Sequence, residues 1–188
     1  MIPWRIKKPF AWLAEEFSQW FRAFLSRIPG QVGCFLRAKL YGFHSGAKSR
    51  VFDHVIIHHP QKLRLGKNVQ IASACHLNAG GGIEIADNTL VGPKVSIWSQ
   101  NHIFARTDLP ICDQGYEFAP VKIEEDVWIG CGAIILPGVV LARGCVIGAG
   151  AVVTNSTQPN TVYAGVPARA INTRNDAPPH DQYTERAA

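Results

Sequence analysis

The sequence predicts an all-β solenoid, in which short strands and tight turns coil around a single core. Three observations support this fold class. Aliphatic residues recur every six positions, a small or β-branched residue stands four positions after each, and Gly, Ala or Glu often follows directly. A period of six fits neither a helix nor a plain alternating strand, but it fits a short strand followed by a turn.

The aliphatic repeat defines the expected coils. Its members are Leu65, Ile71, Leu77, Ile85, Val91, Ile97, Ile123, Ile129, Ile135, Leu141, Ile147 and Val153. Three units make a coil of roughly 18 residues, so every third unit stacks on the same face. A two-residue slip separates Leu77 from Ile85, and Val51 with Ile57 indicates an earlier, irregular coil. Because one coil cannot bury its inner face, we expect stacking to supply the core.

Composition limits the classes of protein that fit. The 188 residues carry a net charge of +5, and 47% are hydrophobic, which excludes wholesale disorder. The five cysteines include no C-x-x-C pair, so we expect no zinc ribbon, redox pair or disulfide framework, and a reducing cytosol fits better. The basic excess allows an anionic partner without choosing among a nucleotide phosphate, a membrane surface and nucleic acid.

The N-terminal segment differs from the repeat. Residues 10–28 carry apolar side chains at helical spacing between Pro9 and Pro29-Gly30, which predicts an amphipathic helix of about 28 Å. The helix is unusually aromatic and basic, so binding to a membrane interface and packing on the coils or on another subunit both fit. We expect neither a signal peptide nor a spanning helix, since no run reaches ~18 apolar residues.

These patterns divide the chain into three parts. Residues 1–45 form the amphipathic helical segment, residues 46–171 the solenoid domain, and residues 172–188 a polar tail without periodicity. The repeat stops after His102 and resumes at Val121, so we expect a loop excursion at about 103–120. An excursion from a regular scaffold is where function is commonly placed.

The repeat resembles the hexapeptide-repeat acyltransferase superfamily over roughly residues 51–171. The resemblance to its sugar O-acetyltransferase branch rests on Val127-Trp128-Ile129-Gly130, on Leu136-Pro137-Gly138-Val139, on residues 146–154 (VIGAGAVVT) and on residues 164–169 (AGVPAR). That branch contains galactoside, maltose and polysaccharide-biosynthesis acetyltransferases. The resemblance implies a left-handed parallel β-helix, a homotrimer with active sites between subunits, and acetyl-CoA as co-substrate with no metal. A scaffold without activity would share this fold.

His102 opens the excursion, and the resemblance makes it the general base. Acetyl transfer from a thioester to an alcohol needs a group that takes the hydroxyl proton and returns it to the leaving thiolate, and imidazole titrates near working pH. The resemblance implies direct attack without an acyl-enzyme. We expect Asn101 and Ser73 to bind the acceptor, although Ala72, next to Ser73, stands where galactoside acetyltransferases have Asn. By position only, three carboxylates are candidates to orient the imidazole: Asp108, Asp113 and Glu117.

The resemblance places acetyl-CoA in a groove between subunits. By this resemblance, the residues at positions that contact acetyl-CoA, the acetyl donor, are Trp128, Cys131, Ala149, Thr154 and Arg169. The guanidinium of Arg169 suits the phosphates of CoA. Asn155 stands where galactoside acetyltransferases have a basic residue, so one phosphate contact is lost or supplied elsewhere. Cys131 should face outward with no base beside it, whereas Cys75 and Cys145 should be inert core residues.

The preferred interpretation is a cytoplasmic, acetyl-CoA-dependent O-acetyltransferase that acts on a sugar hydroxyl in surface polysaccharide or glycolipid biosynthesis. If the N-terminal helix binds lipid, the enzyme would be peripheral at the inner face of the cytoplasmic membrane, and a lipid-linked saccharide would fit as acceptor. Nucleic acid is disfavoured, because basic residues cluster in an aromatic helix.

Two alternatives stay open. One is a sugar-nucleotide N-acetyltransferase. The other is a non-catalytic or metal-binding β-helix of the γ-carbonic-anhydrase type, which the H-x4-H pair of His54 and His59 invites. That type has its pair far into the repeat, where this chain has only His102, so we expect no metal.

Overall fold

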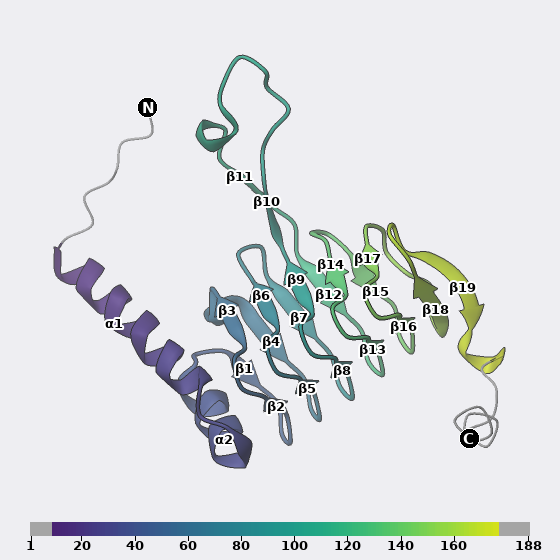
Figure 1. The fold of residues 1–188 in the computed structure, drawn as a ribbon, viewed down its shortest axis with the longest axis horizontal. Helices are drawn as coiled ribbons and strands as arrows, with labels where there is room; N and C mark the ends of the chain where they lie inside the picture. The colour runs from purple at the N-terminus through teal and green to yellow at the C-terminus, as the bar shows by residue number, and fades with distance from the viewer. Residues whose placement is uncertain (1–8, 177–188) are drawn as a thin grey trace.

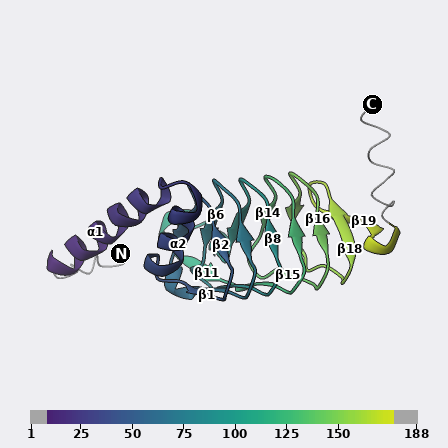
Figure 2. The ribbon, with the colours of Figure 1, turned by 90° about the horizontal axis from the view of Figure 1, so that it is seen from below.

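The computed structural model describes residues 9–176 as a three-sided solenoid with two helices at its N-terminal end (Figure 1). From β1 to β9 and from β12 to β18, consecutive strands lie in different sheets, and each of these strands pairs in parallel with a strand one coil away. Figure 2 shows the stack of coils from another side. The fold is the predicted left-handed parallel β-helix.

Three sheets form the sides of the solenoid. Sheet A contains β1 (His44–Ser45), β4 (Leu63–Leu65), β7 (Ile83–Ile85), β12 (Val121–Ile123) and β15 (Val140–Leu141). Sheet B contains β2 (Arg50–Val51), β5 (Gln70–Ile71), β8 (Leu90–Val91), β13 (Trp128–Ile129), β16 (Val146–Ile147), β18 (Thr161–Ala164) and β19 (Arg169–Thr173). Sheet C contains β3 (Ile56–His58), β6 (His76–Asn78), β9 (Ser96–Trp98), β14 (Ile134–Ile135) and β17 (Val152–Val153).

The register shows where the coils differ in length. Arg64 pairs with His44 and with Glu84, a repeat of 20 residues. Glu84 pairs with Lys122, which pairs with Val140 after 18 residues. The extra residues lie at the corner between sheets C and A, which holds residues 59–62, 79–82 and 99–120. The predicted two-residue slip is therefore an insertion at this corner.

The core is the column of inward side chains. Every aliphatic residue of the predicted repeat is buried, as are Cys75 and Cys145. Burial raises the pKa of the Cys75 thiol to about 11. Burial of one large aliphatic side chain stabilises the fold by about 1.5–3 kcal/mol, and a slip of one residue would turn such side chains outward. The repeat therefore fixes the register of every coil.

Two helices precede the coils. Helix α1 (Pro9–Ser26) ends two residues before the predicted end of the helix at Ile28, and α2 (Gly30–Leu40) follows. The turn between them uses Gly30 at φ +69°, a conformation that glycine adopts at low cost. Helix α2 packs against β2. No helix in the described part of the chain is long and apolar enough to cross a bilayer.

A buried arginine joins both helices to the first coil. Arg37 is fully buried, and its Nε donates to the carbonyl of Val51 at 2.8 Å. Its Nη1 donates to the carbonyls of Leu25 at 2.8 Å and Ile28 at 2.7 Å. No carboxylate among the described residues pairs with it, so these carbonyls compensate for removal of the guanidinium from water.

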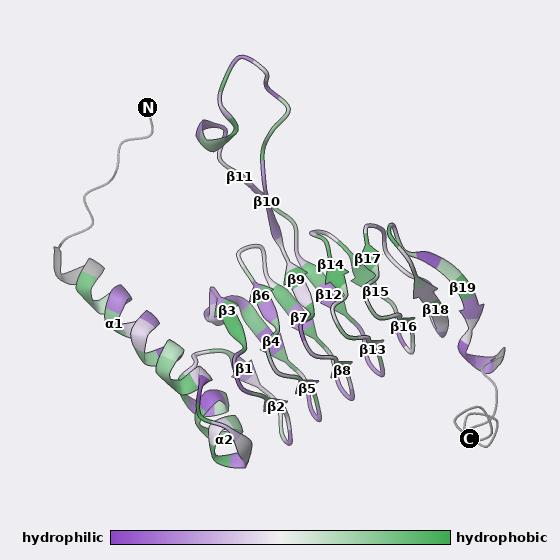
Figure 3. Cartoon of the chain, in the orientation of Figure 1, coloured by the Kyte–Doolittle hydropathy of each residue, from purple (hydrophilic) through white to green (hydrophobic). Residues whose placement is uncertain are grey.

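Helix α1 is amphipathic, but its polar side faces the coils and its apolar side is exposed, the reverse of a helix that covers a core. The row Glu15, Gln19, Arg22 and Ser26 faces the first coil, where it lines a hollow. The apolar row Leu13, Phe17, Trp20 and Phe24 is 55–73% exposed. The two rows are offset by two residues, about 200° around a helix, so they lie on opposite sides. The apolar row therefore does not pack on the coils of its own chain. Figure 3 shows how hydrophobic and hydrophilic residues alternate along α1.

The C-terminal end caps the last coil. β19 runs antiparallel to β18, and a single-turn helix at Arg174–Asp176 follows it. Arg174 reaches back 48 residues to bind the carboxylate of Asp126 at 2.6 Å. Of the predicted polar tail, residues 177–188 lie outside the described residues.

We predict that Arg37→Met lowers the free energy of unfolding by about 3 kcal/mol, because it leaves buried carbonyls without their donor. The measurement is urea denaturation at fixed protein concentration. Arg64→Met, on the exposed face of β4, is the control and should change stability by less than about 0.5 kcal/mol. Equal stabilities of the two variants would refute the role given to Arg37.

Candidate functional site

The excursion is an antiparallel arm that projects from the corner between sheets C and A (Figure 1). Its strands are β10 (Gln100–His102) and β11 (Tyr116–Phe118), with a short 3-10 helix at Ile111–Asp113 between them. Gln100 pairs with Phe118, and His102 pairs with Tyr116. The arm begins at Gln100, before the predicted start at about 103, so His102 lies within its first strand.

Buried polar groups fix the base of the arm. The hydroxyl of Ser99, which is fully buried, donates to the carbonyl of Asn78 at 2.7 Å and accepts the Gly81 N–H at 2.9 Å. The amide oxygen of Asn78 accepts the Gly80 N–H at 3.1 Å. A Cβ on Gly81 would stand 2.2 Å from the Ser99 carbonyl oxygen, so only glycine fits there. The arm therefore leaves the solenoid from a fixed point.

A lysine from another coil also supports the arm. The Nζ of Lys62 donates to the Gly80 carbonyl at 2.6 Å and lies 5.7 Å from the centroid of the Phe118 ring. A cation over an aromatic face contributes about 0.5–1 kcal/mol at an exposed site. Lys62 thereby ties the second strand of the arm to the corner of the coil below.

His102 is exposed on the first strand of the arm. Its ring centroid lies 4.3 Å from that of Tyr116, at an interplanar angle of 40°. Its backbone N–H donates to the side-chain oxygen of Asn101 at 3.0 Å. Within the described residues no carboxylate is hydrogen-bonded to its imidazole, and Asp108 is bound by Arg106 instead. Tyr116 is therefore the side chain that the structure places against His102.

A second row of candidate residues lies at the corner between sheets B and C. Backbone hydrogen bonds link the carbonyl of Asp53 to Ala74, that of Ser73 to Lys94, that of Pro93 to Gly132 and that of Cys131 to Gly150. Ser73, Pro93, Cys131 and Ala149 therefore occupy equivalent places on successive coils. The hydroxyl of Ser73 donates to the carboxylate of Asp53 at 2.7 Å and lowers the pKa of that carboxyl.

The last two coils approach each other closely at this corner. A Cβ on Gly130 would meet the backbone nitrogen of Ala149 at 2.6 Å. Cys131 and Ala149 are exposed on the outer side of the corner, and the indole of Trp128 beside them is 54% exposed. An apolar, open surface of this kind can accept an extended ligand along the backbone.

The other two donor candidates lie on different elements. Thr154 follows β17 and is exposed at the corner between sheets C and A, and its hydroxyl donates to Asn155 at 2.8 Å. Arg169 opens β19 on the cap over the last coil, where its Nη1 donates to the Ala168 carbonyl at 2.9 Å. Arg169 is exposed on this cap.

Within one chain the candidate residues do not form one cluster. Cys131 and Ala149 lie at the edge of sheet C where its strands start. His102 lies beyond the opposite edge, where the strands of sheet C end. Ser73 is on the edge opposite His102, and Thr154 is on the same edge but two coils further along. The width of a sheet therefore separates the histidine from most of the other candidates.

Sequence patterns did not identify several residues that shape this region. Tyr116, Lys62 and the pair Asn78 and Ser99 became apparent only when the pairing of the arm was known. In the sequence, the one available signal for the base of the arm was the occurrence of polar residues at buried positions beside Gly80 and Gly81. No group of three or more potential metal ligands occurs among the described residues, and His54 is bound to Asp53 at 2.8 Å.

Comparison with known proteins gives consistent matches. Residues 120–155 match the family model described as bacterial transferase hexapeptide (six repeats). The chain is 31% identical over 166 residues to dTDP-4-amino-4,6-dideoxy-D-glucose acyltransferase of Escherichia coli, a match that covers 74% of this chain and 86% of that protein. It is 40% identical over 98 residues to galactoside O-acetyltransferase of Escherichia coli strain K12, covering 52% and 47% respectively.

A solved structure shares the fold. A galactoside acetyltransferase in complex with coenzyme A has a TM-score of 0.75 and 28% identity, covering 83% of this chain and 80% of that chain. The chain spans about half the length of several curated relatives that it matches.

We predict that two of the five thiols react with an alkylating reagent in the native protein. Cys112 and Cys131 are exposed, whereas Cys34, Cys75 and Cys145 are buried. Burial also raises the pKa of Cys75 and Cys145, which disfavours the reactive thiolate. Mass spectrometry of the labelled peptides, with urea-unfolded protein as the control, measures this. Rapid labelling of Cys75 or Cys145 in the native protein would contradict the register of the coils.

Proposed function

Because the chain belongs to the hexapeptide-repeat acyltransferase family, we propose that it transfers an acetyl group from acetyl-CoA to a sugar hydroxyl. The observation that carries this proposal is the placement of His102. An exposed imidazole stands on an arm whose base is held by buried hydrogen bonds, at the edge of sheet C opposite the corner where the coils leave an open surface. The similarity to galactoside acetyltransferases supports a sugar hydroxyl as the acceptor in this proposal.

In the proposed reaction His102 acts as general base. Its imidazole takes the proton from the sugar hydroxyl as the oxygen attacks the thioester carbon, which gives a tetrahedral oxyanion. Collapse breaks the C–S bond, and the imidazolium returns the proton to the leaving CoA thiolate. The products are an acetyl ester and CoA. The Tyr116 ring limits rotation of the imidazole, and a backbone N–H of a neighbouring coil would stabilise the oxyanion.

We further propose that the site forms between copies of the chain in a homotrimer. One chain holds His102 and the surface around Cys131 on opposite edges of sheet C, so a neighbouring copy is needed to bring a donor groove to the histidine. In this arrangement Trp128, Cys131 and Ala149 would contact the extended arm of CoA. Thr154 and Arg169 would contact its other groups, with the guanidinium of Arg169 on a phosphate. Asn101 would contact the acceptor.

The acceptor is proposed to be part of a surface polysaccharide or glycolipid, at the inner face of the cytoplasmic membrane. Residues 1–40 contain seven basic and two acidic residues, a net charge of +5, and residues 41–188 contain twelve of each. The whole net charge of the chain is thus in the segment that contains α1, whose apolar row is exposed. An aromatic row beside basic residues is typical of a helix that lies on an anionic bilayer.

We predict that His102→Ala lowers kcat on the order of 10²–10⁴-fold and leaves CoA affinity unchanged, because the base is lost and the donor surface is not. Thiol release with a panel of sugars, nucleotide sugars and lipid-linked saccharides measures turnover. His44→Ala, an exposed histidine of β1, is the control. Unchanged turnover in His102→Ala would exclude the proposed role.

The panel also tests the alternative of N-acetylation, which the amino-sugar acyltransferase relative favours. Turnover with an amino-sugar nucleotide and none with any hydroxyl acceptor would replace the proposed acceptor class. The fold and the role of His102 would not change.

We predict that Phe17→Ser with Trp20→Ser reduces binding to anionic phosphatidylglycerol vesicles at least tenfold in a sedimentation assay, because the apolar row loses its two most exposed members. Ile171→Ser, which removes an exposed apolar side chain at the other end of the solenoid, should bind as the wild type does. Equal binding of all three proteins would exclude α1 as a membrane contact.

A further inference from the structure

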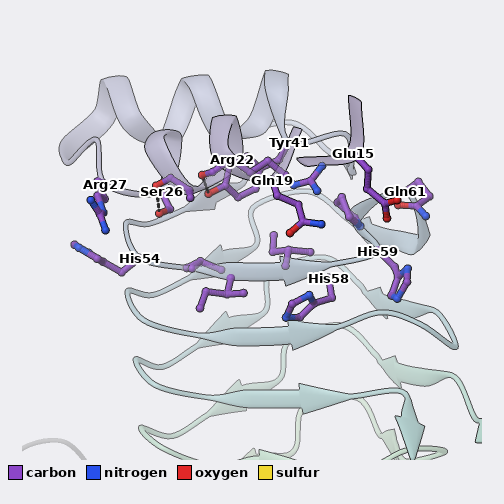
Figure 4. A pocket seen from close by; sticks show the side chains of 15 residues that line it. Glu15, Gln19, Arg22, Ser26, Arg27, Tyr41, His54, His58, His59 and Gln61 are labelled. Atoms are coloured by element: carbon purple, nitrogen blue, oxygen red, sulfur yellow. Dashed lines mark hydrogen bonds between the residues drawn. The ribbon is translucent and has the colours of Figure 1, made fainter. Parts of the chain in front are cut away.

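A second candidate site lies away from the arm, between α1 and the first coil (Figure 4). The cavity has a volume of about 640 Å³. On the helix side it is lined by Gln19, Arg22 and Arg27, and on the coil side by His54, His58 and His59. Figure 4 shows the side chains of the helix and of the first coil that line it.

The cavity has an excess of positive charge. Arg22 donates to the hydroxyl of Ser18 at 2.8 Å, and neither Arg22 nor Arg27 forms an ion pair with a carboxylate of the described residues. Of the nearby carboxylates, Asp53 is already bound by Ser73 and His54. Glu15 lies at one end of the cavity, near Gln61. Two guanidinium groups therefore line this space, and neither is ion-paired with a carboxylate in residues 9–176.

Two of the histidines stand at corners with a left-handed backbone, and Ala74 and Lys94 share this conformation at the places equivalent to His54 on the next two coils. His54 has φ 56° and His59 has φ 55°, in the left-handed region that favours glycine or asparagine. The position of His54 is taken by Gly132 and Gly150 in the last two coils. At this corner the first coil thus carries the imidazole of His54 where the last two coils carry glycine. The imidazoles of His54 and His59 both line the cavity.

The third histidine begins a row that runs toward the arm. Partial burial, with the charges of His76, His59 and Arg22, lowers the pKa of His58. The ring of His76 lies 5.1 Å from the ring of His58 and 5.1 Å from that of Trp98. The Nε2 atom of His76 is buried and has no hydrogen-bond partner among the residues that the structure describes. A lowered pKa favours the neutral imidazole, and a bound anion would favour the protonated form instead.

The row ends close to the base of the arm. His58 pairs with Asn78, and Asn78 with Trp98, so the cavity and the arm are two strand spacings apart, roughly 9.6 Å. Gln100, the first residue of the arm, follows two positions after Trp98. A ligand held in the cavity could therefore extend along the outer face of sheet C toward His102.

We propose that this cavity binds the diphosphate of a lipid-linked saccharide, the acceptor class of the proposed function on which this inference rests. Arg22 and Arg27 bind the phosphate oxygens, and His58 and His59 donate further hydrogen bonds. The apolar row of α1 faces away from the cavity, so a bilayer beneath that row would present a lipid diphosphate at the edge of the helix. The attached sugar would then point along sheet C toward the arm.

The first test uses inorganic pyrophosphate and isothermal titration calorimetry on the full chain. We expect wild type to bind it, and Arg22→Gln with Arg27→Gln to bind it at least tenfold more weakly. The matched control is Arg50→Gln with Arg64→Gln, which removes the same charge from exposed positions on sheets B and A and should bind as wild type does. Equal weakening in both double variants, or no binding by wild type, would overturn the proposal.

A second variant covers the case in which the arginine pair disturbs α1. His58→Gln keeps a polar side chain on the coil side of the cavity and should weaken pyrophosphate binding at least threefold, with an unchanged thermal melting temperature. Unchanged affinity in His58→Gln would count against the cavity as the binding site.

The source of the phosphate is tested with phosphatidylcholine vesicles that contain polyprenyl diphosphate, with vesicles that contain the polyprenyl alcohol as the control. We expect retention on the diphosphate vesicles only, and its loss in the Arg22 and Arg27 variant. Pyrophosphate binding in solution without vesicle retention would overturn the lipid source. Pyrophosphate binding and vesicle retention do not depend on acetyl transfer, so His102→Ala should behave as wild type does in both assays. A failure of the proposed function would be seen separately, in the thiol-release assay.

Discussion

The closed column of aliphatic side chains is the constraint on which the rest of this structure depends. Each strand of the coils places a buried residue on the axis, and each strand pairs with the equivalent strand one coil away. A residue added within a strand would turn the following side chains outward and break the ladder. Added residues can therefore be accommodated only at corners. The corner between sheets C and A holds two extra residues in the first coils and the whole arm after the third.

The same constraint explains how a loop can position a catalytic group. The arm leaves from Ser99 and returns at Ala119, and these two ends are tied to Gly81, Asn78 and Gly138 through hydrogen bonds to the coils on either side. Because the coils cannot slide, the ends of the arm cannot move apart. The imidazole of His102, three residues from Ser99, is thus positioned by the register of the core.

The period of six was sufficient to predict the coils, their inward residues, the burial of Cys75 and Cys145, and the existence of the excursion. It could not predict which residues meet across the arm, because the pairing of His102 with Tyr116 depends on the hairpin register and not on the repeat. Helical spacing predicted the apolar row of α1, but not that this row would face away from the coils. Spacing shows which side chains share a face, whereas packing decides what covers that face. The cavity at His58 was missed for the same reason, since α1 and the first coil form it jointly.

The central claim is that His102 of one copy acts on a donor held by another. Mixed oligomers test this most directly. His102→Ala removes the base, and Ala149→Trp blocks the open surface at the exposed corner between sheets B and C. Each variant alone should be inactive. After the two variants are dissociated and reassembled together, we expect thiol release to return, because an intact histidine then meets an intact surface. Mass spectrometry shows whether mixed oligomers form. Mixed oligomers that remain as inactive as the separate variants would contradict the sharing of one site between two copies.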